Sequence, residues 1–264
     1  MDRKLHGVLV LVISACLWLS ASGARAETEV DLALVLAVDV SRSMDPEEQE
    51  LQRQGFIEAF RSPLVHDAIR NGMLGRITVT YVEWSSVDEQ KVIEPWTIVD
   101  GPESAREFAD GLSKTPIGRI QRTSISGAID FAAKLLAETG VSPIRKVIDI
   151  SGDGPNSSGR GVVAARDEAT AQGITINGLP IMLKRPSGFG DMENLDLYYR
   201  DCVIGGQGAF LVPVREQRQF AEAIRTKIIR EIADLPTPLI RKVQAEAPVD
   251  CQAGERRMYQ WNRN

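Results

Sequence analysis

Two patterns of apolar and polar positions alternate along residues 30–234. Short runs of Leu, Val and Ile, typical of strands, are separated by longer segments with the apolar spacing of amphipathic helices. The strand-like runs are apolar almost throughout, as expected when both faces of a sheet are covered. The pattern predicts a doubly wound α/β fold, with helices on both faces of a mostly parallel sheet. The expected strands are residues 32–39, 76–84, 146–151, 174–183 and 209–214, and the expected helices are residues 46–62, 103–114, 124–139, 160–173 and 215–234.

One strand-like run differs from the others. Residues 92–99, VIEPWTIV, contain Pro95, which has no backbone N–H to donate to a neighbouring strand. Such a residue is tolerated at the edge of a sheet. We therefore expect a short antiparallel edge strand here.

The two ends of the chain differ in character from the part between them. Residues 1–26 have a basic start, an apolar core of VLVLVISACLWL and small residues up to Ala26, which is the pattern of a cleaved export signal. The apolar run is too short to span a bilayer. Cleavage would leave a domain of residues 27–234 and a proline-containing C-terminal tail of residues 235–264. A periplasmic or secreted location is expected, and a lipoprotein anchored at Cys16 is the alternative.

Charge, cysteine and histidine content exclude several kinds of site. Loss of residues 1–26 removes three basic residues and one acidic residue, which moves the formal net charge from −5 to −7 and argues against a nucleic-acid surface. Cys202 and Cys251 then remain, and an even pair in an exported chain indicates a disulfide. His66 is the only remaining histidine, so a zinc site or a Ser/His/Asp triad would have to use this one residue. We expect His66 on the surface.

Oxygen-bearing side chains follow the first expected strand at close intervals. Asp39 ends that strand, and Ser41 and Ser43 follow at alternate positions, so an extended loop can turn all three toward one side. The next acids have a structural explanation, because Asp45 is suited to cap a helix and Glu48 to complete its capping box. Capping does not explain Asp39 or the serines, whose hard oxygens suit a small cation such as magnesium.

Two later loops are expected in the same crevice. Thr123 precedes an expected helix, and Asp153 follows the expected strand at residues 146–151. In a doubly wound sheet, loops at the carboxyl ends of neighbouring strands converge on the ligand site. Asp149 is a rival acid, although its place within the apolar run VIDIS indicates that it points inward. The alternative to a metal site is that these side chains only satisfy loop amides and cap a helix.

These residues resemble a known family. The stretch DVSRSM is similar to the Asp-x-Ser-x-Ser of the von Willebrand factor type A family, to which integrin I domains belong, and the resemblance covers roughly residues 30–233. It implies a metal-ion-dependent adhesion site (MIDAS). The run YYRDCVIGGQGAF resembles a bacterial exported subgroup of unassigned function. The third loop departs from the family, because it reads Ser151-Gly152-Asp153 where Thr-Asp-Gly is common. The implied metal ligands are Asp39, Ser41, Ser43, Thr123 and Asp153.

The resemblance implies a binding module rather than an enzyme. A magnesium or manganese ion would be held with one position left for an Asp or Glu carboxylate of a protein partner. The first alternative is a hydrolase or phosphotransferase with Asp39 as nucleophile, but the second acid that such sites want two residues later is replaced by Ser41. No glycine-rich phosphate loop is visible. The second alternative is a structural or assembly protein in which the metal only stabilises the fold.

One further loop is expected beside this site. Residues 184–199, KRPSGFGDMENLDLYY, follow an expected strand and should lie at the same end of the sheet. Lys184, Arg185 and Phe189 offer positive charge and apolar area close to an acidic ligand. We expect this loop to help select the partner, with an ordinary surface loop as the alternative.

Overall fold

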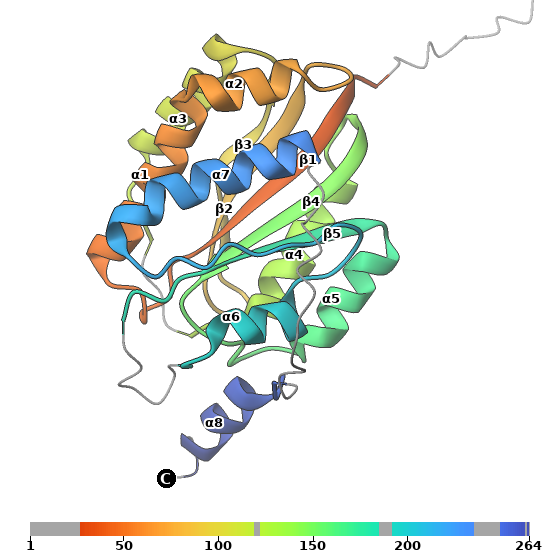
Figure 1. Ribbon diagram of the computed structural model, residues 1–264. Helices are drawn as coiled ribbons and strands as arrows, with labels where there is room; N and C mark the ends of the chain where they lie inside the picture. Colours follow the sequence, from red (N-terminus) through yellow and green to blue (C-terminus); the bar gives the residue numbers. More distant parts are fainter. Residues whose placement is uncertain (1–26, 119–121, 185–191, 235–248, 262, 264) are drawn as a thin grey trace, which may run out of the picture.

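A five-stranded sheet forms the centre of the computed structural model, which describes residues 27–118, 122–184, 192–234, 249–261 and 263 (Figure 1). The strand order is β3-β2-β1-β4-β5, and all neighbouring pairs are parallel except β2 and β3. This is the doubly wound, mostly parallel sheet that the sequence predicts. The strands are β1 (Glu29–Asp39), β2 (Ile77–Trp84), β3 (Gln90–Val99), β4 (Ser142–Gly152) and β5 (Ile174–Pro180).

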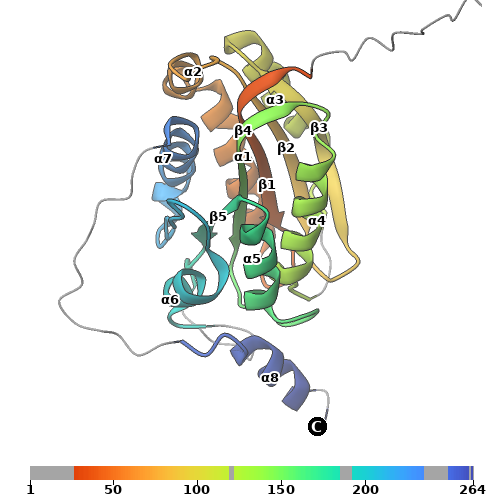
Figure 2. The same ribbon diagram turned by 90° about the vertical axis from the view of Figure 1, so that its right-hand side faces the viewer.

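Helices cover both faces of the sheet (Figure 2). One face carries α1 (Pro46–Arg61), α2 (Pro63–Arg70), α3 (Pro102–Lys114) and α7 (Phe220–Ala233), and the other carries α4 (Ile125–Ala137), α5 (Val162–Ala171), α6 (Leu195–Tyr198) and the π-helical turn η1 (Tyr199–Val203). A short 3₁₀ turn, η2 (Gln217–Gln219), precedes α7.

Strand β1 lies at the centre of the sheet and contributes to both cores. Leu32, Leu34 and Leu36 pack toward α1 and α7, whereas Ala33 and Val35 pack toward α4 and α5. Alternate residues of a strand point to opposite faces, so an apolar residue is required at every position. This explains the uninterrupted apolar run that ends at the candidate site.

The expected edge strand is present as β3, which pairs antiparallel with β2 and is ten residues long rather than short. The pairing passes from Val79 with Thr97 to Tyr81 with Glu94, so an irregularity lies between them. Pro95 falls within that irregularity, where its missing N–H leaves no gap in the regular ladder.

Two expectations from the sequence are wrong. Residues 209–214 do not form a strand of the sheet; they make isolated bridges, Gly178 with Leu211 and Ile181 with Val214. His66 is not a surface residue, because it lies on α2 with 4% of its surface exposed and its Nε2 is 2.7 Å from the carbonyl oxygen of Phe60. The eight-residue helix α2 turns this side chain inward against the preceding turn.

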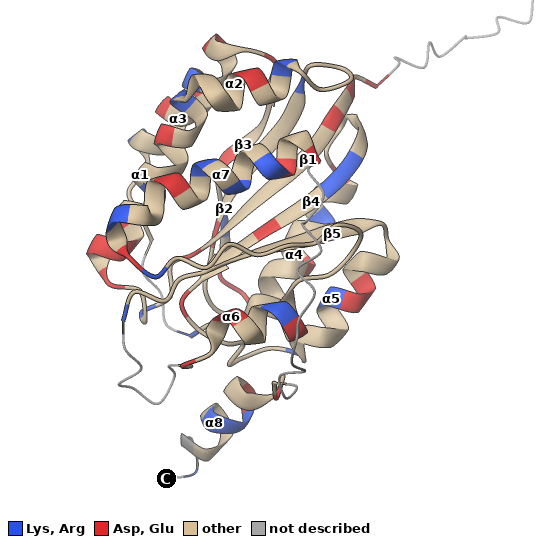
Figure 3. Cartoon of the chain, in the orientation of Figure 1, with Lys and Arg blue, Asp and Glu red and all other residues tan. Residues whose placement is uncertain are grey.

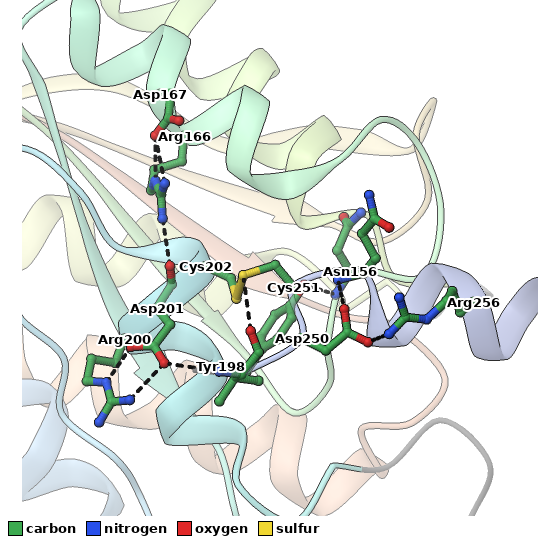
Figure 4. Close-up of a disulfide and its surroundings, with 12 residues drawn as sticks. Asn156, Arg166, Asp167, Tyr198, Arg200, Asp201, Cys202, Asp250, Cys251 and Arg256 are labelled. Atoms are coloured by element: carbon green, nitrogen blue, oxygen red, sulfur yellow. Dashed lines mark hydrogen bonds and ion pairs between the residues drawn. A yellow bond between two sulfur atoms is a disulfide. The ribbon is translucent and has the colours of Figure 1, made fainter. Parts of the chain in front are cut away.

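The described part of the C-terminal tail contains a helix, α8 (Ala253–Trp261), that is attached to the domain at its start (Figure 4). Cys251 forms a disulfide with Cys202 of η1, with the two Cα atoms 5.5 Å apart, so the structure contains the expected bond. Nδ2 of Asn156, in the loop after β4, donates a hydrogen bond to Oε1 of Glu255 at 2.8 Å. The tail is therefore joined to the same end of the domain as the strand-end loops.

Charged side chains of both signs are interspersed along α3, α5 and α7 (Figure 3). Exposed ion pairs join neighbouring helices, such as Arg61 of α1 with Asp110 of α3 at 2.6 Å. Pairs exposed to solvent contribute little to stability. Among the described residues, no helix combines the length and the apolar character that crossing a membrane requires. The expected export signal at residues 1–26 lies outside the described residues.

Candidate metal site

The loop after β1 brings the first three candidate ligands together. The backbone amide of Ser41 donates a hydrogen bond to Oδ1 of Asp39 at 2.7 Å, and Oγ of Ser41 lies 2.9 Å from Oγ of Ser43. Asp39 and Ser41 are buried, whereas Ser43 is exposed. The side-chain oxygens thus run from the interior to the surface.

Asp153 joins this group from the neighbouring strand. The register of β1 and β4 pairs Val38 with Ser151, so the loops after the two strands begin side by side. Oγ of Ser43 donates a hydrogen bond to Oδ1 of Asp153 at 2.6 Å. Four of the five candidate ligands are therefore linked by one chain of short contacts.

Thr123 is held against the loop that follows β4. Its carbonyl oxygen accepts hydrogen bonds from the amides of Ser157 and Ser158, at 2.9 and 3.1 Å, in the loop that begins with Asp153. The structure thus holds Thr123 against that loop by its backbone, and only 9% of its surface is exposed. Arg122, just before it, has φ of 79°, a left-handed conformation that is uncommon for a residue other than glycine. Backbone strain of this kind is concentrated at functional sites.

The carboxylate of Asp39 is poorly accommodated by the chain alone. It is fully buried, and its Oδ2 has no hydrogen-bond partner in the described part of the structure. Burial, and then the charge of Asp153, raise the pKa of Asp39 well above its ordinary value, against the lowering effect of hydrogen bonds from Ser41 and from the backbone amide of Asp153. A divalent cation between the two acids would replace this repulsion by attraction, so the residues present fit a metal ion.

A glycine leaves room next to the free oxygen of Asp39. A Cβ atom on Gly152 would lie 2.8 Å from Oδ2 of Asp39 and 3.1 Å from Oη of Tyr199. A Cβ atom essentially never lies within 3.0 Å of another atom, so the contact with Asp39 would force a shift. The Ser151-Gly152-Asp153 order in the third loop therefore has a steric reason, since any side chain at position 152 would displace Asp39.

Asp149, the rival acid, has another partner. It is buried within β4, and Nζ of Lys227 on α7 lies 2.6 Å from its Oδ1. The same amine lies 2.5 Å from Oε1 of Glu231, which also accepts a hydrogen bond from Nδ2 of Asn177 at 3.0 Å. Asp149 thus belongs to a separate buried cluster under α7, an arrangement that favours Asp153 as the third-loop ligand.

The donor set is poor in strong ligands. Within the described ranges, no group of three or more His, Cys, Asp or Glu residues is placed to hold a metal. The candidate site instead offers two carboxylates and three hydroxyls. Hard oxygens in small number suit magnesium, which retains water ligands readily.

The loop after β5 reaches the candidate site through Lys184. Its Nζ donates a hydrogen bond to the carbonyl oxygen of Ser43 at 3.0 Å and lies 2.5 Å from Oε2 of Glu48. Asp45 and Glu48 form the expected capping box of α1, so Lys184 ties this loop to the start of that helix. Arg185 and Phe189, expected beside it, lie outside the described residues. Sequence reasoning missed Tyr199, because nothing in the YYRDC run shows which tyrosine faces Asp39.

Comparison with known proteins identifies the family and the fold of the chain. A family described as "Protein of unknown function (DUF1194)" matches residues 29–236. The chain belongs to the DUF1194 family. No curated relative matches. Among solved structures, proximal thread matrix protein 1 of the mussel byssus has a TM-score of 0.57 at 13% identity over 78% of this chain and 49% of its own. A second structure of that protein has a zinc-occupied MIDAS motif, with a TM-score of 0.52 at 11% identity over 77% of this chain and 46% of its own.

Two bacterial structures are similar at the same level. The pilus adhesin SpaC of Lactobacillus rhamnosus GG has a TM-score of 0.54 at 12% identity over 79% of this chain and 30% of its own. A von Willebrand factor type A protein of Catenulispora acidiphila has 0.52 at 14% identity, over 78% and 43%. The chain thus spans less than half the length of these proteins. At such identities the likeness shows the fold alone, and that fold is of the von Willebrand factor type A kind.

Proposed function

We propose that this DUF1194 protein is an exported, metal-dependent protein-binding module. Asp39, Ser41, Ser43, Thr123 and Asp153 would hold one magnesium or manganese ion, which supplies an electrophilic centre for a carboxylate. The partner would present an Asp or Glu side chain to it. The buried carboxylate of Asp39, which has a free oxygen and no cation beside it among the described residues, is the observation that carries the proposal.

The gradient of exposure defines the direction of approach. Asp39 is fully buried and cannot touch a partner, whereas Ser43 is exposed and Asp153 is half-buried. A partner would therefore reach the metal from the side of Ser43. Two carboxylates balance a double positive charge, and the hydroxyls add no further negative charge. The bound ion would keep its attraction for an acid from outside.

The location and the kind of partner follow from separate observations. A disulfide between Cys202 and Cys251 fits an oxidising compartment outside the cytoplasm. Structural neighbours include a pilus adhesin and a byssus matrix protein, both of which are proteins of adhesive or matrix structures by name. These points support a periplasmic or secreted binding role and offer no support for an enzyme.

Calorimetry with magnesium and manganese tests the metal site directly. We expect saturable binding by the wild type and none by Asp39→Ala, because the substitution removes one of two carboxylates. Asp45→Ala is the matched control: it removes a nearby acid that caps α1, at a cost of about 1 kcal/mol to stability, and should leave metal affinity unchanged. Absence of binding by the folded wild type, or equal affinity in Asp39→Ala, would contradict the proposal.

The partner is tested by capture from periplasmic extract on immobilised protein. A partner of the proposed kind binds in magnesium, is released by chelator and does not bind Asp39→Ala. Blocking the partner's carboxyl groups as amides should abolish capture. Capture that survives both chelator and amidation would show that binding uses another surface.

A further inference from the structure

Two consecutive tyrosines are buried next to the candidate metal site but differ in their hydroxyl contacts. Oη of Tyr198 accepts a hydrogen bond from the backbone amide of Asn156 at 3.1 Å, in the loop that begins with Asp153. Oη of Tyr199 is buried and has no hydrogen-bond partner in the described part of the structure. A buried hydroxyl without a partner is unfavourable, so its retention calls for an explanation.

The hydroxyl of Tyr199 and the free oxygen of Asp39 face the same small space. Both atoms lie close to the point where a Cβ of Gly152 would be, at 3.1 Å for Oη and 2.8 Å for Oδ2. One atom can donate a hydrogen bond and the other can only accept one while Asp39 is ionised. Two complementary groups are thus left open side by side at the inner end of the candidate site.

The fold holds Tyr199 in this position by several independent means. A Cβ on Gly178 of β5 would lie 2.7 Å from Cδ1 of Tyr199, so a second glycine makes room for the ring. Tyr199 begins the π-helical turn η1, a conformation that is rare and often found at functional sites. The same turn carries Cys202, whose disulfide to Cys251 anchors it to the tail (Figure 4).

We propose that Tyr199 is a positioning residue of the candidate metal site. When a divalent cation is bound, its hydroxyl donates a hydrogen bond to the carboxylate of Asp39, directly or through one water in the space above Gly152. This bond fixes which oxygen of Asp39 faces the ion. Groups that orient metal ligands in this way commonly change affinity by about 10–100-fold when removed. The inference rests on the proposed function, because it assumes that Asp39 binds metal.

Tyr199→Phe and Tyr198→Phe form a matched pair that tests the proposal, since each removes one hydroxyl from adjacent buried rings. We expect Tyr199→Phe to weaken manganese binding in calorimetry by about tenfold or more. In chelator, the urea midpoint of this variant should equal or exceed that of the wild type, because the lost hydroxyl has no partner there. Tyr198→Phe should show the reverse: a lower urea midpoint in chelator, and manganese affinity within about twofold of the wild type.

A purely structural role of Tyr199 predicts a different result. Its hydroxyl would then affect the urea midpoint in chelator and not the affinity for manganese. Unchanged affinity in Tyr199→Phe, alongside a wild type that binds manganese, would overturn this inference and leave the proposed function standing. A wild type that binds no manganese would overturn both. Loss of affinity of the same size in both variants would also overturn it, because it would point to general loosening of the loops.

Discussion

Two buried aspartates on neighbouring strands meet different environments. Asp149 lies within β4, and Lys227 supplies a positive charge 2.6 Å away. Asp39 lies at the end of β1 and is equally buried, yet no described lysine, arginine or histidine forms an ion pair with it. The strands β1 and β4 are directly paired, so the difference does not come from depth in the fold.

The two buried acids differ in whether the chain itself supplies a positive charge beside them. At Asp149 the chain supplies a counter-charge, Lys227, which Asp149 shares with Glu231. At Asp39 the nearby groups are hydroxyls, the backbone amides of Ser41 and Asp153 and a second acid, so a balancing positive charge would have to come from a bound cation. A buried unpaired carboxylate is expensive, and its retention favours a ligand-binding role.

The largest effect should come from removing the internal counter-charge. In Lys227→Met, Asp149 and Glu231 would be left in the core without a cation. Breaking a buried pair in this way costs about 3–5 kcal/mol, so we expect that loss in the free energy of unfolding measured with urea. Lys134→Met, at an exposed position of α4, is the control and should change stability by less than about 0.5 kcal/mol. Equal midpoints for both variants would show that Asp149 does not depend on Lys227.

Titration of Glu231, in the same cluster as Lys227 and Asp149, should make the free energy of unfolding depend on pH. We expect this effect to be smaller than that of Lys227→Met. Burial, and then the charge of Asp149, raise the pKa of Glu231 from 4.5 to about 7, against the lowering effects of Lys227 and Asn177. The folded state therefore holds this proton more tightly than the unfolded state. The resulting stability is complete below about pH 4.5 and is lost as the pH rises through 7.

Glu231→Gln isolates this contribution, because the amide does not titrate. In chelator, the wild type should lose stability relative to Glu231→Gln between pH 4.5 and pH 7, by about 1.4 kcal/mol for each unit of pKa shift. The difference between the two urea midpoints, measured across that range, checks the prediction. A constant difference would mean that Glu231 titrates normally in the folded protein.

Sequence reasoning reached the fold and the linear order of the candidate site for clear physical reasons. Apolar runs and helical spacing report directly which residues face a core, so the sheet, its edge at β3 and the cap of α1 could be predicted. Contacts between segments that are distant in the chain produce no such pattern in the sequence. Neither the pairing of Lys227 with Asp149 nor the approach of Tyr199 to Asp39 could be read from spacing.

The two wrong predictions have the same cause. Each infers the position of a residue in the fold from its local sequence pattern alone. The run at residues 209–214 is apolar enough for a strand, but it touches β5 only through isolated bridges. His66 is itself polar, yet the short helix α2 turns it inward to Phe60. In α2, Ser62 as cap and Pro63 at the first position were signals that could have been used.

The smallest effect on the metal-free fold should come from Asp39→Asn. Asparagine keeps an oxygen that can accept the hydrogen bond from the amide of Ser41, and it removes a buried charge that has no cation beside it. In chelator at neutral pH, we expect a free energy of unfolding equal to that of the wild type or up to about 2 kcal/mol higher. Magnesium should reverse the order, because a ligand that binds only the folded wild type stabilises it by RT ln(1 + [L]/Kd). Urea unfolding of both proteins with and without magnesium therefore gives a crossing pattern. Loss of several kcal/mol in chelator would instead show that Asp39, like Asp149, is already balanced within the protein, and the contrast between the two aspartates would fail.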